Sequence, residues 1–236
     1  MRAPLRPAVL GLAAAAGLAS PAVARAAEPR PDRPMLTATG DLVASRSFEV
    51  EAGGAWRADA VRAPLRLKFG GGIVEPRIGV DLSGMNYGQP GLDAGVKLGI
   101  VRDEAIALAG YVESLLPVGY EERWTSEAGF ALTARLSSGT SARFNAGMAL
   151  TGDEGFLTVS GIPLRGLIAV PMGRRVEPFA EAEAIIGPLN PAWSVNGGLL
   201  LWLTDSLAGD AAFGWNIETS APLIQLGLTA NAGLLR

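Results

Sequence analysis

Two carboxylates, Glu181 and Glu183, are the residues whose types and spacing come nearest to catalytic chemistry. They stand two positions apart in an alternating stretch, so both project from the same face of a predicted strand over 176–186. A glycosidase needs two such groups on either side of a sugar, with the pKa of one of them raised. Nothing in the spacing requires that arrangement, and two charges facing water explain the pair more simply. We therefore predict no enzyme activity.

Other catalytic and metal-binding chemistry is limited by what the composition lacks. The 236 residues include neither His nor Cys, which removes Ser-His-Asp catalysis, the commonest metal ligand, thiol chemistry and thiolate zinc sites. The glycines at 70–72 precede neither a helix nor a Lys-Ser/Thr pair, so they form no phosphate loop. Residues 152–155 lack the ligand spacing of a calcium loop. We expect no metal and no cofactor.

The stretch from Val61 to Leu82 indicates which elements position the charged side chains. Apolar residues alternate with charged or small ones on both sides of Gly71-Gly72. Period-two alternation around a glycine pair is typical of a β-hairpin with a primed turn, because both turn residues need a positive φ. One face of this hairpin is apolar and the other is strongly charged. The pattern predicts the repeating unit of a barrel that meets lipid outside and water inside.

A two-residue glycine loop would fix the register of this hairpin. Lys68 then lies opposite Glu75, and Arg66 lies opposite Arg77, which requires an acidic neighbour from another strand. In a membrane the charged face must be inside, since Arg or Lys at the midplane of a barrel's lipid face costs about 2–4 kcal/mol. We expect Leu67→Arg to impair folding into bilayers, and Lys68→Gln to leave folding intact and change ion selectivity.

The same alternation recurs from Arg46 to the end of the chain, with a strand around 156–170 whose phase Pro163 blurs. It predicts an all-β fold: a single up-and-down antiparallel transmembrane β-barrel of about 12 strands, whose closure removes every sheet edge. Connection lengths alternate, as between short periplasmic turns and longer outer loops. The tight turns are predicted at 71–72, 102–104, 138–140, 172–174 and 204–206, and the longer links at 84–91, 115–123 and 187–192.

The predicted faces assign two sets of residues. The polar faces supply the expected pore-lining charges Arg62, Arg66, Lys68, Glu75, Arg77, Asp81, Asp93, Lys97, Glu127, Arg135, Arg143, Glu181, Glu183 and Asp210. The apolar faces place four tryptophans at the outer rim, where amphipathic indole rings favour the membrane interface. These membrane-interface aromatic residues are Trp56, Trp124, Trp193 and Trp215.

Three segments are expected along the chain. Residues 1–26 resemble a secretory signal peptide, with Arg2 and Arg6 before a short apolar run and small residues at the cleavage site. Residues 27–45, rich in Pro and Arg, are predicted to be a loose periplasmic lead-in, and 46–236 the barrel. The expected location is the bacterial outer membrane. Expected partners are outer-membrane lipid, a small-molecule solute and the assembly machinery; a net charge of −3 without a basic stripe disfavours nucleic acid.

Three stretches, 61–83, 92–117 and 193–216, resemble a family of outer-membrane proteins described as transporters of the MetA phenol-degradation pathway. The resemblance is carried by Pro64-Leu65-Arg66-Leu67-Lys68-Phe69-Gly70, by Glu75-Pro76-Arg77-Ile78-Gly79-Val80, and by Leu203-Thr204-Asp205-Ser206-Leu207 followed by Asp210. It implies a small outer-membrane barrel associated with uptake of aromatic or other small molecules. The last residues, Leu234-Leu235-Arg236, depart from the aromatic ending that many such barrels share.

The leading functional hypothesis is a passive channel or facilitator for small solutes, aromatic or hydrophobic ones among them, with a charged lumen. The second is a non-transporting structural barrel, in which the same charges pair across the lumen and fill it. The third is a soluble exported lipocalin-like binder with its apolar faces turned inward.

Overall fold

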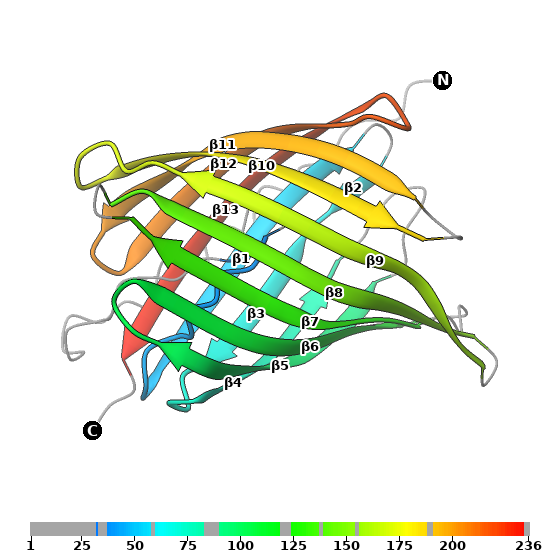
Figure 1. Ribbon diagram of the computed structural model, residues 1–236, viewed down its shortest axis with the longest axis horizontal. Coiled ribbons are helices and arrows are strands. Elements are labelled where there is room, and N and C mark those ends of the chain that lie inside the picture. Colours follow the sequence, from blue (N-terminus) through cyan, green and yellow to red (C-terminus); the bar gives the residue numbers. More distant parts are fainter. Residues whose placement is uncertain are drawn as a thin grey trace, which may run out of the picture.

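The computed structural model describes Asp32 and residues 37–57, 60–82, 90–118, 124–136, 139–153, 156–187 and 191–233. Its strands form one antiparallel sheet, and β13 pairs with β1 to close the wall (Figure 1). The strands are β1 (Ser47–Arg57), β2 (Ala60–Arg62), β3 (Pro64–Phe69), β4 (Val74–Asp81), β5 (Gly91–Arg102), β6 (Ile106–Pro117), β7 (Trp124–Arg135), β8 (Ser141–Asp153), β9 (Phe156–Ala169), β10 (Val176–Ile186), β11 (Ala192–Thr204), β12 (Leu207–Asn216) and β13 (Ala221–Gly233). β2 and β3 continue one another along β1, so the barrel has twelve strands, and the predicted fold is confirmed.

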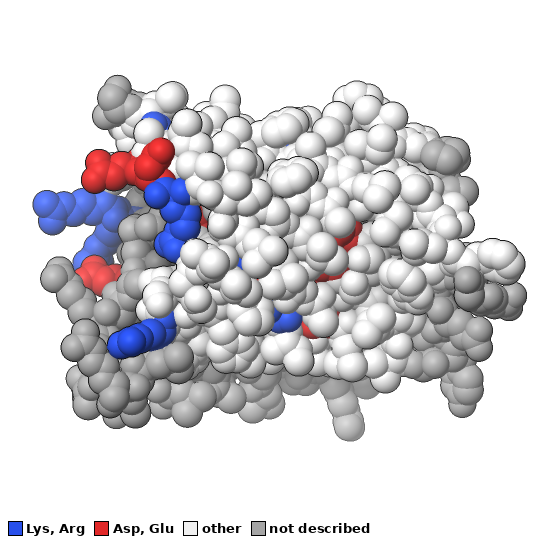
Figure 2. Space-filling model, turned by 60° about the horizontal axis from the view of Figure 1, so that its bottom comes forward, with Lys and Arg blue, Asp and Glu red and all other residues white. Residues whose placement is uncertain are grey.

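Strand alternation separates an apolar outer face from a polar inner face. The outward side chains of Ile78, Phe130 and Phe213 are 54%, 59% and 57% exposed, whereas Lys68 and Lys97 are 1% and 0% exposed. On the face shown in Figure 2, charged side chains gather near one end and most of the wall is uncharged. A soluble barrel would turn its apolar side chains inward instead. Within the described ranges, no helix is long and apolar enough to cross a membrane.

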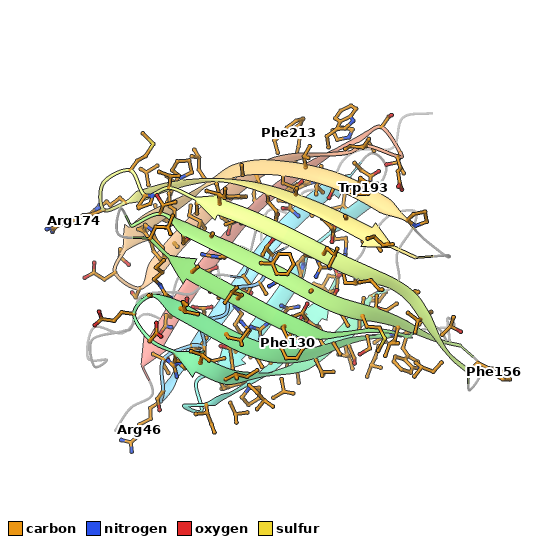
Figure 3. All side chains as sticks on the ribbon, viewed as in Figure 1. Arg46, Phe130, Phe156, Arg174, Trp193 and Phe213 are labelled. Atoms are coloured by element: carbon orange, nitrogen blue, oxygen red, sulfur yellow. The ribbon has the colours of Figure 1, made fainter. Side chains whose placement is uncertain are left out.

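Short turns join the strands at one end of the barrel, the left end in Figure 1. Residues 103–105 and 205–206 separate consecutive strands there, as predicted. Arg46 and Arg174 lie at this end, and Phe156 lies at the other (Figure 3). At the other end, residues 82–90 separate β4 from β5, in keeping with the predicted longer links, whose central residues lie outside the described ranges.

The register of the first hairpin differs from the prediction. Leu67 pairs with Ile78 and Lys68 with Arg77, whereas a two-residue glycine loop would have placed Lys68 against Glu75. The predicted opposition of two arginines is therefore wrong as well. The shift is two residues, an even number, so every side chain keeps its predicted face.

The turn is longer because Gly70 pairs with the chain that precedes β1. Its carbonyl accepts a hydrogen bond from the N–H of Arg46 over 2.8 Å. A Cβ on Gly70 would lie 1.8 Å from the carbonyl oxygen of Ala44, so this close approach requires glycine. The turn then closes through a 2.9 Å hydrogen bond from the N–H of Gly71 to the carbonyl of Val74.

The pairing of β9 settles the phase that Pro163 obscured in the sequence. Pro163 and Leu167 are both buried on the inner side, so Arg165 between them also faces the interior. The pairing of β8 with β9 shifts its register between Ala149 and Leu150 of β8, close to this part of β9. An extra residue in one strand changes the local alternation, which is why the pattern alone was ambiguous.

Candidate functional site

The structure places the predicted pore-lining charges on the inner face of the barrel. The buried ones are Lys68, Glu75, Arg77, Asp81, Lys97, Glu181 and Asp210. Arg62 is exposed, and the half-buried ones are Arg66, Asp93, Glu127, Arg135, Arg143 and Glu183. Their position inside the barrel is thus established, and their role in lining a pore stays a prediction.

Three cations from neighbouring strands form a cluster, called here the cation cluster: Lys68 of β3, Arg77 of β4 and Lys97 of β5. All three converge on Asp32, which is 6% exposed and belongs to no strand. The Asp32 Oδ2 atom lies 2.7 Å from Arg77 Nη2, 2.9 Å from Lys68 Nζ and 3.6 Å from Lys97 Nζ. Burial alone would raise the pKa of the Asp32 carboxyl, but these three positive charges hold it well below its usual range.

The cation cluster also has partners on the barrel wall. Lys68 Nζ lies 2.6 Å from Glu51 Oε1 and 3.1 Å from Glu49 Oε1, and both glutamates are fully buried. Arg77 Nη2 lies 2.6 Å from Glu75 Oε1. Each of these bonds is charge-assisted and shielded from water, so removing one partner would leave a buried charge uncompensated.

A second network of ion pairs lies beside the cation cluster, toward the end of the barrel that has the longer links. Arg66 Nε donates to Asp93 Oδ2 over 2.7 Å, and its Nη2 lies 3.3 Å from Glu113 Oε2. The predicted need of Arg66 for an acidic neighbour from another strand is therefore met by β5 and β6. Arg62 forms an ion pair with Asp81 in the same region, although Pro64 is the residue directly opposite Asp81 in the sheet.

A third network lies across the lumen and centres on Arg165 of β9. Its Nη2 donates to Glu127 Oε2 over 2.8 Å, and its Nε donates to Glu183 Oε1 over 2.7 Å. Tyr111 donates its hydroxyl proton to Glu127 over 2.5 Å. Glu183 is thus held by an arginine, and Glu181 accepts from Asn196 Nδ2 over 3.2 Å. Both members of the candidate acid–base pair, Glu181 and Glu183, therefore accept hydrogen bonds from neighbouring side chains.

A stretch of chain ahead of β1 lies inside the barrel; Asp32 and residues 37–44 are called here the lumen segment. Leu42 and Val43 are 3% and 1% exposed. The N–H of Ala38 donates to Asn145 Oδ1 over 2.6 Å, and the N–H of Val43 donates to Glu75 Oε2 over 2.6 Å. These described residues depart from the expectation of a loose lead-in.

The middle of the lumen segment is held by close backbone contact with the wall. The N–H of Gly40 donates to Thr133 Oγ1 over 2.9 Å, and the Thr39 and Thr133 hydroxyl oxygens are 3.0 Å apart. A Cβ on Gly40 would lie 2.2 Å from the carbonyl oxygen of Ala107, so only glycine fits here. Lys97 Nζ donates to the carbonyl of Thr39 over 2.8 Å.

The inner face of β10 to β13, called here the acidic wall, differs from the rest of the lumen. The sequence has no Lys or Arg from 176 to 233, and the inward charges are Glu177, Glu181, Glu183 and Asp210. Among the described residues, buried polar atoms without a hydrogen-bond partner gather on this wall: Asn196 Oδ1, Gln225 Oε1, Thr229 Oγ1 and both side-chain polar atoms of Asn231. Apolar contact replaces polar contact at one place, where Phe179 and Leu200 pack with Leu167 of β9.

A cavity of about 560 Å³ occupies the lumen on the side of the second and third networks. Asp32, Ala38 and Arg77 are among its lining residues, and the rest of the lining carries ionised side chains of both signs. Those side chains are Arg62, Arg66, Asp81, Asp93, Glu113, Glu127 and Arg165. At ~30 Å³ for each water molecule, the cavity has room for roughly twenty waters or a small polar solute.

Sequence reasoning missed several residues of this interior. Glu49, Glu51 and Glu113 obey the same period-two alternation as the predicted set and could have been found by applying it evenly. Arg165 could be assigned to the inner face only once the phase of β9 was known. The entry of Asp32 into the lumen has no periodic signal, because the segment that carries it is not a strand.

The four predicted interface tryptophans lie near the strand ends opposite the short turns. Trp56, Trp193 and Trp215 are 43%, 53% and 41% exposed, and Trp124 is half-buried over Gly152. Their contact with a membrane interface stays a prediction. Among the described residues, no group of three or more His, Cys, Asp or Glu side chains is placed to hold a metal ion.

No protein-family model matches the chain, and no curated protein matches it. The fold is similar to solved outer-membrane barrels. The KdgM porin is 10% identical, with a TM-score of 0.64 over 77% of this chain and 98% of that chain. The NanC porin is 8% identical, with a TM-score of 0.62 over 77% and 98%. The COG4313 outer membrane channel from Pseudomonas putida F1 is 12% identical, with a TM-score of 0.60 over 85% and 99%.

At these identities the likeness establishes the fold, a closed twelve-stranded antiparallel barrel that outer-membrane channels also adopt. The resemblance to the MetA-pathway transporter family is not confirmed.

Proposed function

We propose that the chain is an outer-membrane channel for passive passage of small polar solutes through a charged lumen. The observation that carries this proposal is the 560 Å³ cavity, which lies inside a closed barrel and is lined by both signs of charge. Such a lining replaces part of a solute's hydration shell and orients its dipole. The proposal includes no enzyme activity and no cofactor.

The apolar outer face supports a location in the outer membrane. A signal peptide at residues 1–26 would direct the export that this location requires. Outward residues such as Ile78, Phe130 and Phe213 would be costly to leave in water, and lipid removes that cost. Expected partners are outer-membrane lipid, the assembly machinery that inserts barrels, and the solute. Trp56, Trp193 and Trp215 would then lie at the outer interface.

The lumen segment closes the channel in the proposed resting state. Its contacts with Thr133, Asn145 and Glu75 reach three different parts of the wall, so it crosses the interior next to the cavity that its Asp32 and Ala38 line. Passage then requires this segment to move while the barrel stays intact. Inserted segments held by individual hydrogen bonds and ion pairs belong to the less stable parts of a structure, whereas the closed sheet is the stable part.

Solute identity is proposed from the lining. Ionised groups dominate the cavity wall, and Tyr111 is its aromatic side chain among the described residues, so polar or charged solutes fit better than purely hydrophobic ones. A structural neighbour is the KdgM porin in complex with disordered oligogalacturonate, a charged sugar. Aromatic solutes with a polar or ionised group remain within this class.

The test uses the absence of native cysteine. In a Thr39→Cys, Thr133→Cys double variant the two sulfurs would replace hydroxyl oxygens that are 3.0 Å apart, close enough for a disulfide after small rotations. Planar-bilayer recording should show few and small conductance steps in the oxidised form and larger or more frequent ones after reduction. The two single variants, treated identically, should not respond to the reductant.

The alternative is a structural barrel that transports nothing. The specific observation in its favour is the density of ion pairs, since Lys68, Arg77 and Arg165 each contact at least two carboxylates. Absence of conductance steps from both the wild type and the reduced double variant, at every voltage, would reject the channel and leave this alternative. A soluble lipocalin-like binder does not fit, because the apolar faces point outward.

A further inference from the structure

The position of Asp32 defines a binding site for one carboxylate. The cation cluster presents two ammonium groups and a guanidinium group from three adjacent strands, and all three approach one carboxylate oxygen within 2.7–3.6 Å. The second oxygen, Oδ1, accepts the N–H of Thr39 over 2.9 Å. Both oxygens therefore have donors, as a fixed site for a carboxylate requires.

Among the described carboxylates around this cluster, Asp32 differs from the others in where it is attached. Glu49, Glu51 and Glu75 are part of strands that the closed sheet holds in place. Asp32 lies on the lumen segment, outside the strands, and lines the cavity together with Arg77. It is thus the partner of the cluster that can leave without disturbing the wall.

We propose that the cation cluster is a carboxylate-binding site for the solute, that Asp32 is its built-in occupant, and that exchange of one for the other releases the lumen segment. This inference rests on the proposed channel function and deepens it by assigning a solute class: small molecules that carry a carboxylate. The solute reaches the site through the cavity, whose lining includes Asp32 and Arg77.

Exchange is favoured over simple departure of Asp32. If Asp32 left without replacement, Lys68, Arg77 and Lys97 would each lose a charged partner in a buried place, which is costly. A solute carboxylate replaces those contacts one for one. Because Asp32 is on the same chain, its effective concentration is on the order of millimolar, so the solute must compete at that level or bind through additional groups.

A carboxylate fits better than other anions. Glu49, Glu51 and Glu75 remain within reach of the same cations, and Glu113 also contacts Arg77. A dianion such as phosphate would meet their repulsion with twice the charge, whereas a carboxylate restores the charge that Asp32 provided. A cation would be repelled by the cluster itself.

Release of Asp32 loosens the lumen segment through contacts that start at the same cluster. Lys97 Nζ holds the carbonyls of Thr39 and Asp41 over 2.8 and 3.2 Å, and Asp32 Oδ1 holds the N–H of Thr39. A solute bound in place of Asp32 removes the hydrogen bond that Asp32 Oδ1 accepts from the N–H of Thr39. The segment is then held by the Asp41–Arg135 ion pair, by Lys97 and by hydrogen bonds to Glu181, Asn145, Thr133 and Glu75, each of which contributes modestly on its own.

The experiment uses a single introduced thiol, Val43→Cys, in the full chain reconstituted in lipid vesicles. Val43 is 1% exposed, so its thiol should react slowly with a water-soluble maleimide. Benzoate should accelerate the reaction about tenfold or more in a saturable way, while benzamide, which has the same ring without the charge, should not. Phosphate is the anion control and should be weaker than benzoate.

Two further variants separate competition from general loosening. Asp32→Asn in the Val43→Cys background should give fast labelling without benzoate and little further response. Asp32→Glu should keep labelling slow and responsive, because it retains the carboxylate. The proposal is overturned if benzoate has no effect at saturating concentration, if benzamide acts equally, or if Asp32→Asn labels as slowly as the parent.

Bilayer conductance, measured on the same variants, distinguishes failure of the carboxylate site from failure of the channel proposal. If bilayer recordings show steps but thiol labelling ignores benzoate, the channel stands and the carboxylate site fails. If labelling responds to benzoate but no variant conducts, the binding site stands and the channel proposal fails.

Discussion

The two sides of the lumen differ in how their charges are used. The inner face of β2 to β5, called here the basic wall, carries Arg62, Arg66, Lys68, Arg77 and Lys97, each bonded to carboxylates or to the lumen segment. The acidic wall has glutamates, Asp210 and amide side chains but no Lys or Arg in its sequence. Both sides hold the lumen segment, since Glu181 of the acidic wall accepts the N–H of Thr37, but the basic wall does so through a cluster of charges. Among the described residues, the acidic wall keeps buried polar atoms without hydrogen-bond partners.

This difference produces an electric field across the lumen. A solute with separated charges would turn its negative end toward the basic wall and its positive or donor end toward the acidic wall. The described interior as a whole is acidic. Its cations are Arg62, Arg66, Lys68, Arg77, Lys97, Arg135, Arg143 and Arg165, and its carboxylates are Asp32, Asp41, Glu49, Glu51, Glu75, Asp81, Asp93, Glu113, Glu127, Glu177, Glu181, Glu183 and Asp210.

The largest expected effect comes from breaking the basic wall at Lys68. Lys68→Gln leaves Asp32, Glu49 and Glu51 without their shared cation, and uncompensated buried charge costs about 3–5 kcal/mol. This replaces the sequence-based expectation that the substitution leaves folding intact. Urea unfolding in vesicles measures the change in the free energy of unfolding.

The matched change on the acidic wall is Glu181→Gln. An amide oxygen can still accept a hydrogen bond from Asn196 or from the N–H of Thr37, so the loss should be about 1 kcal/mol. Equal losses for Lys68→Gln and Glu181→Gln would contradict the distinction between the two walls.

The next effect compares the inside of the basic wall with its outside. Leu67 is adjacent to Lys68 and projects to the opposite face, so Leu67→Arg places a charge toward lipid at a cost of about 2–4 kcal/mol. The yield of folded barrel in vesicles, read from the heat-modifiable gel shift, should fall. Leu67→Ile keeps an apolar group and should fold like the parent. Normal folding of Leu67→Arg would mean that this face does not meet lipid.

Ion selectivity should reveal the effect of the acidic wall's charges on permeation, independently of their effect on stability. The excess of carboxylates predicts a preference for cations, and a lumen charge contributes on the order of 1 kcal/mol in a water-filled path, which is about fivefold in relative permeability. Asp210→Asn should lower the cation-to-anion permeability ratio, and Arg66→Gln on the basic wall should raise it. Reversal potentials in a salt gradient measure both. A shift in the same direction for both variants would mean that at least one of the two side chains does not act on the conduction path.

The sequence predicted the wall much better than its contents. Strict alternation revealed the strands, their faces and most inner charges, because the period of two is imposed by the backbone on every strand. It failed at Gly70, where contact with the chain ahead of β1 lengthens a turn, and at Arg165, where a register shift disturbs the period. Asp32 could not be placed, since an irregular segment inside a barrel follows no period and depends on individual contacts.

The smallest effect tests whether the unpartnered polar atoms of the acidic wall contribute to stability. Thr229 of β13 and Thr133 of β7 are 0% and 2% exposed, and Val is nearly isosteric with both. The Thr133 hydroxyl contacts the lumen segment through Gly40 and Thr39, so Thr133→Val should cost about 1–3 kcal/mol. Among the described residues the Thr229 hydroxyl has no hydrogen-bond partner, so Thr229→Val should change the free energy of unfolding by no more than about 0.5 kcal/mol.

A neutral Thr229→Val with an altered solute permeability would mean that this wall keeps polar atoms for the solute. Unfolding in urea and vesicle swelling with a zwitterionic solute measure the two quantities on the same preparation. A destabilisation of Thr229→Val as large as that of Thr133→Val would show that Thr229 is bonded in the folded barrel. The interpretation that the acidic wall keeps unpaired polar atoms for the solute would then be wrong at this position.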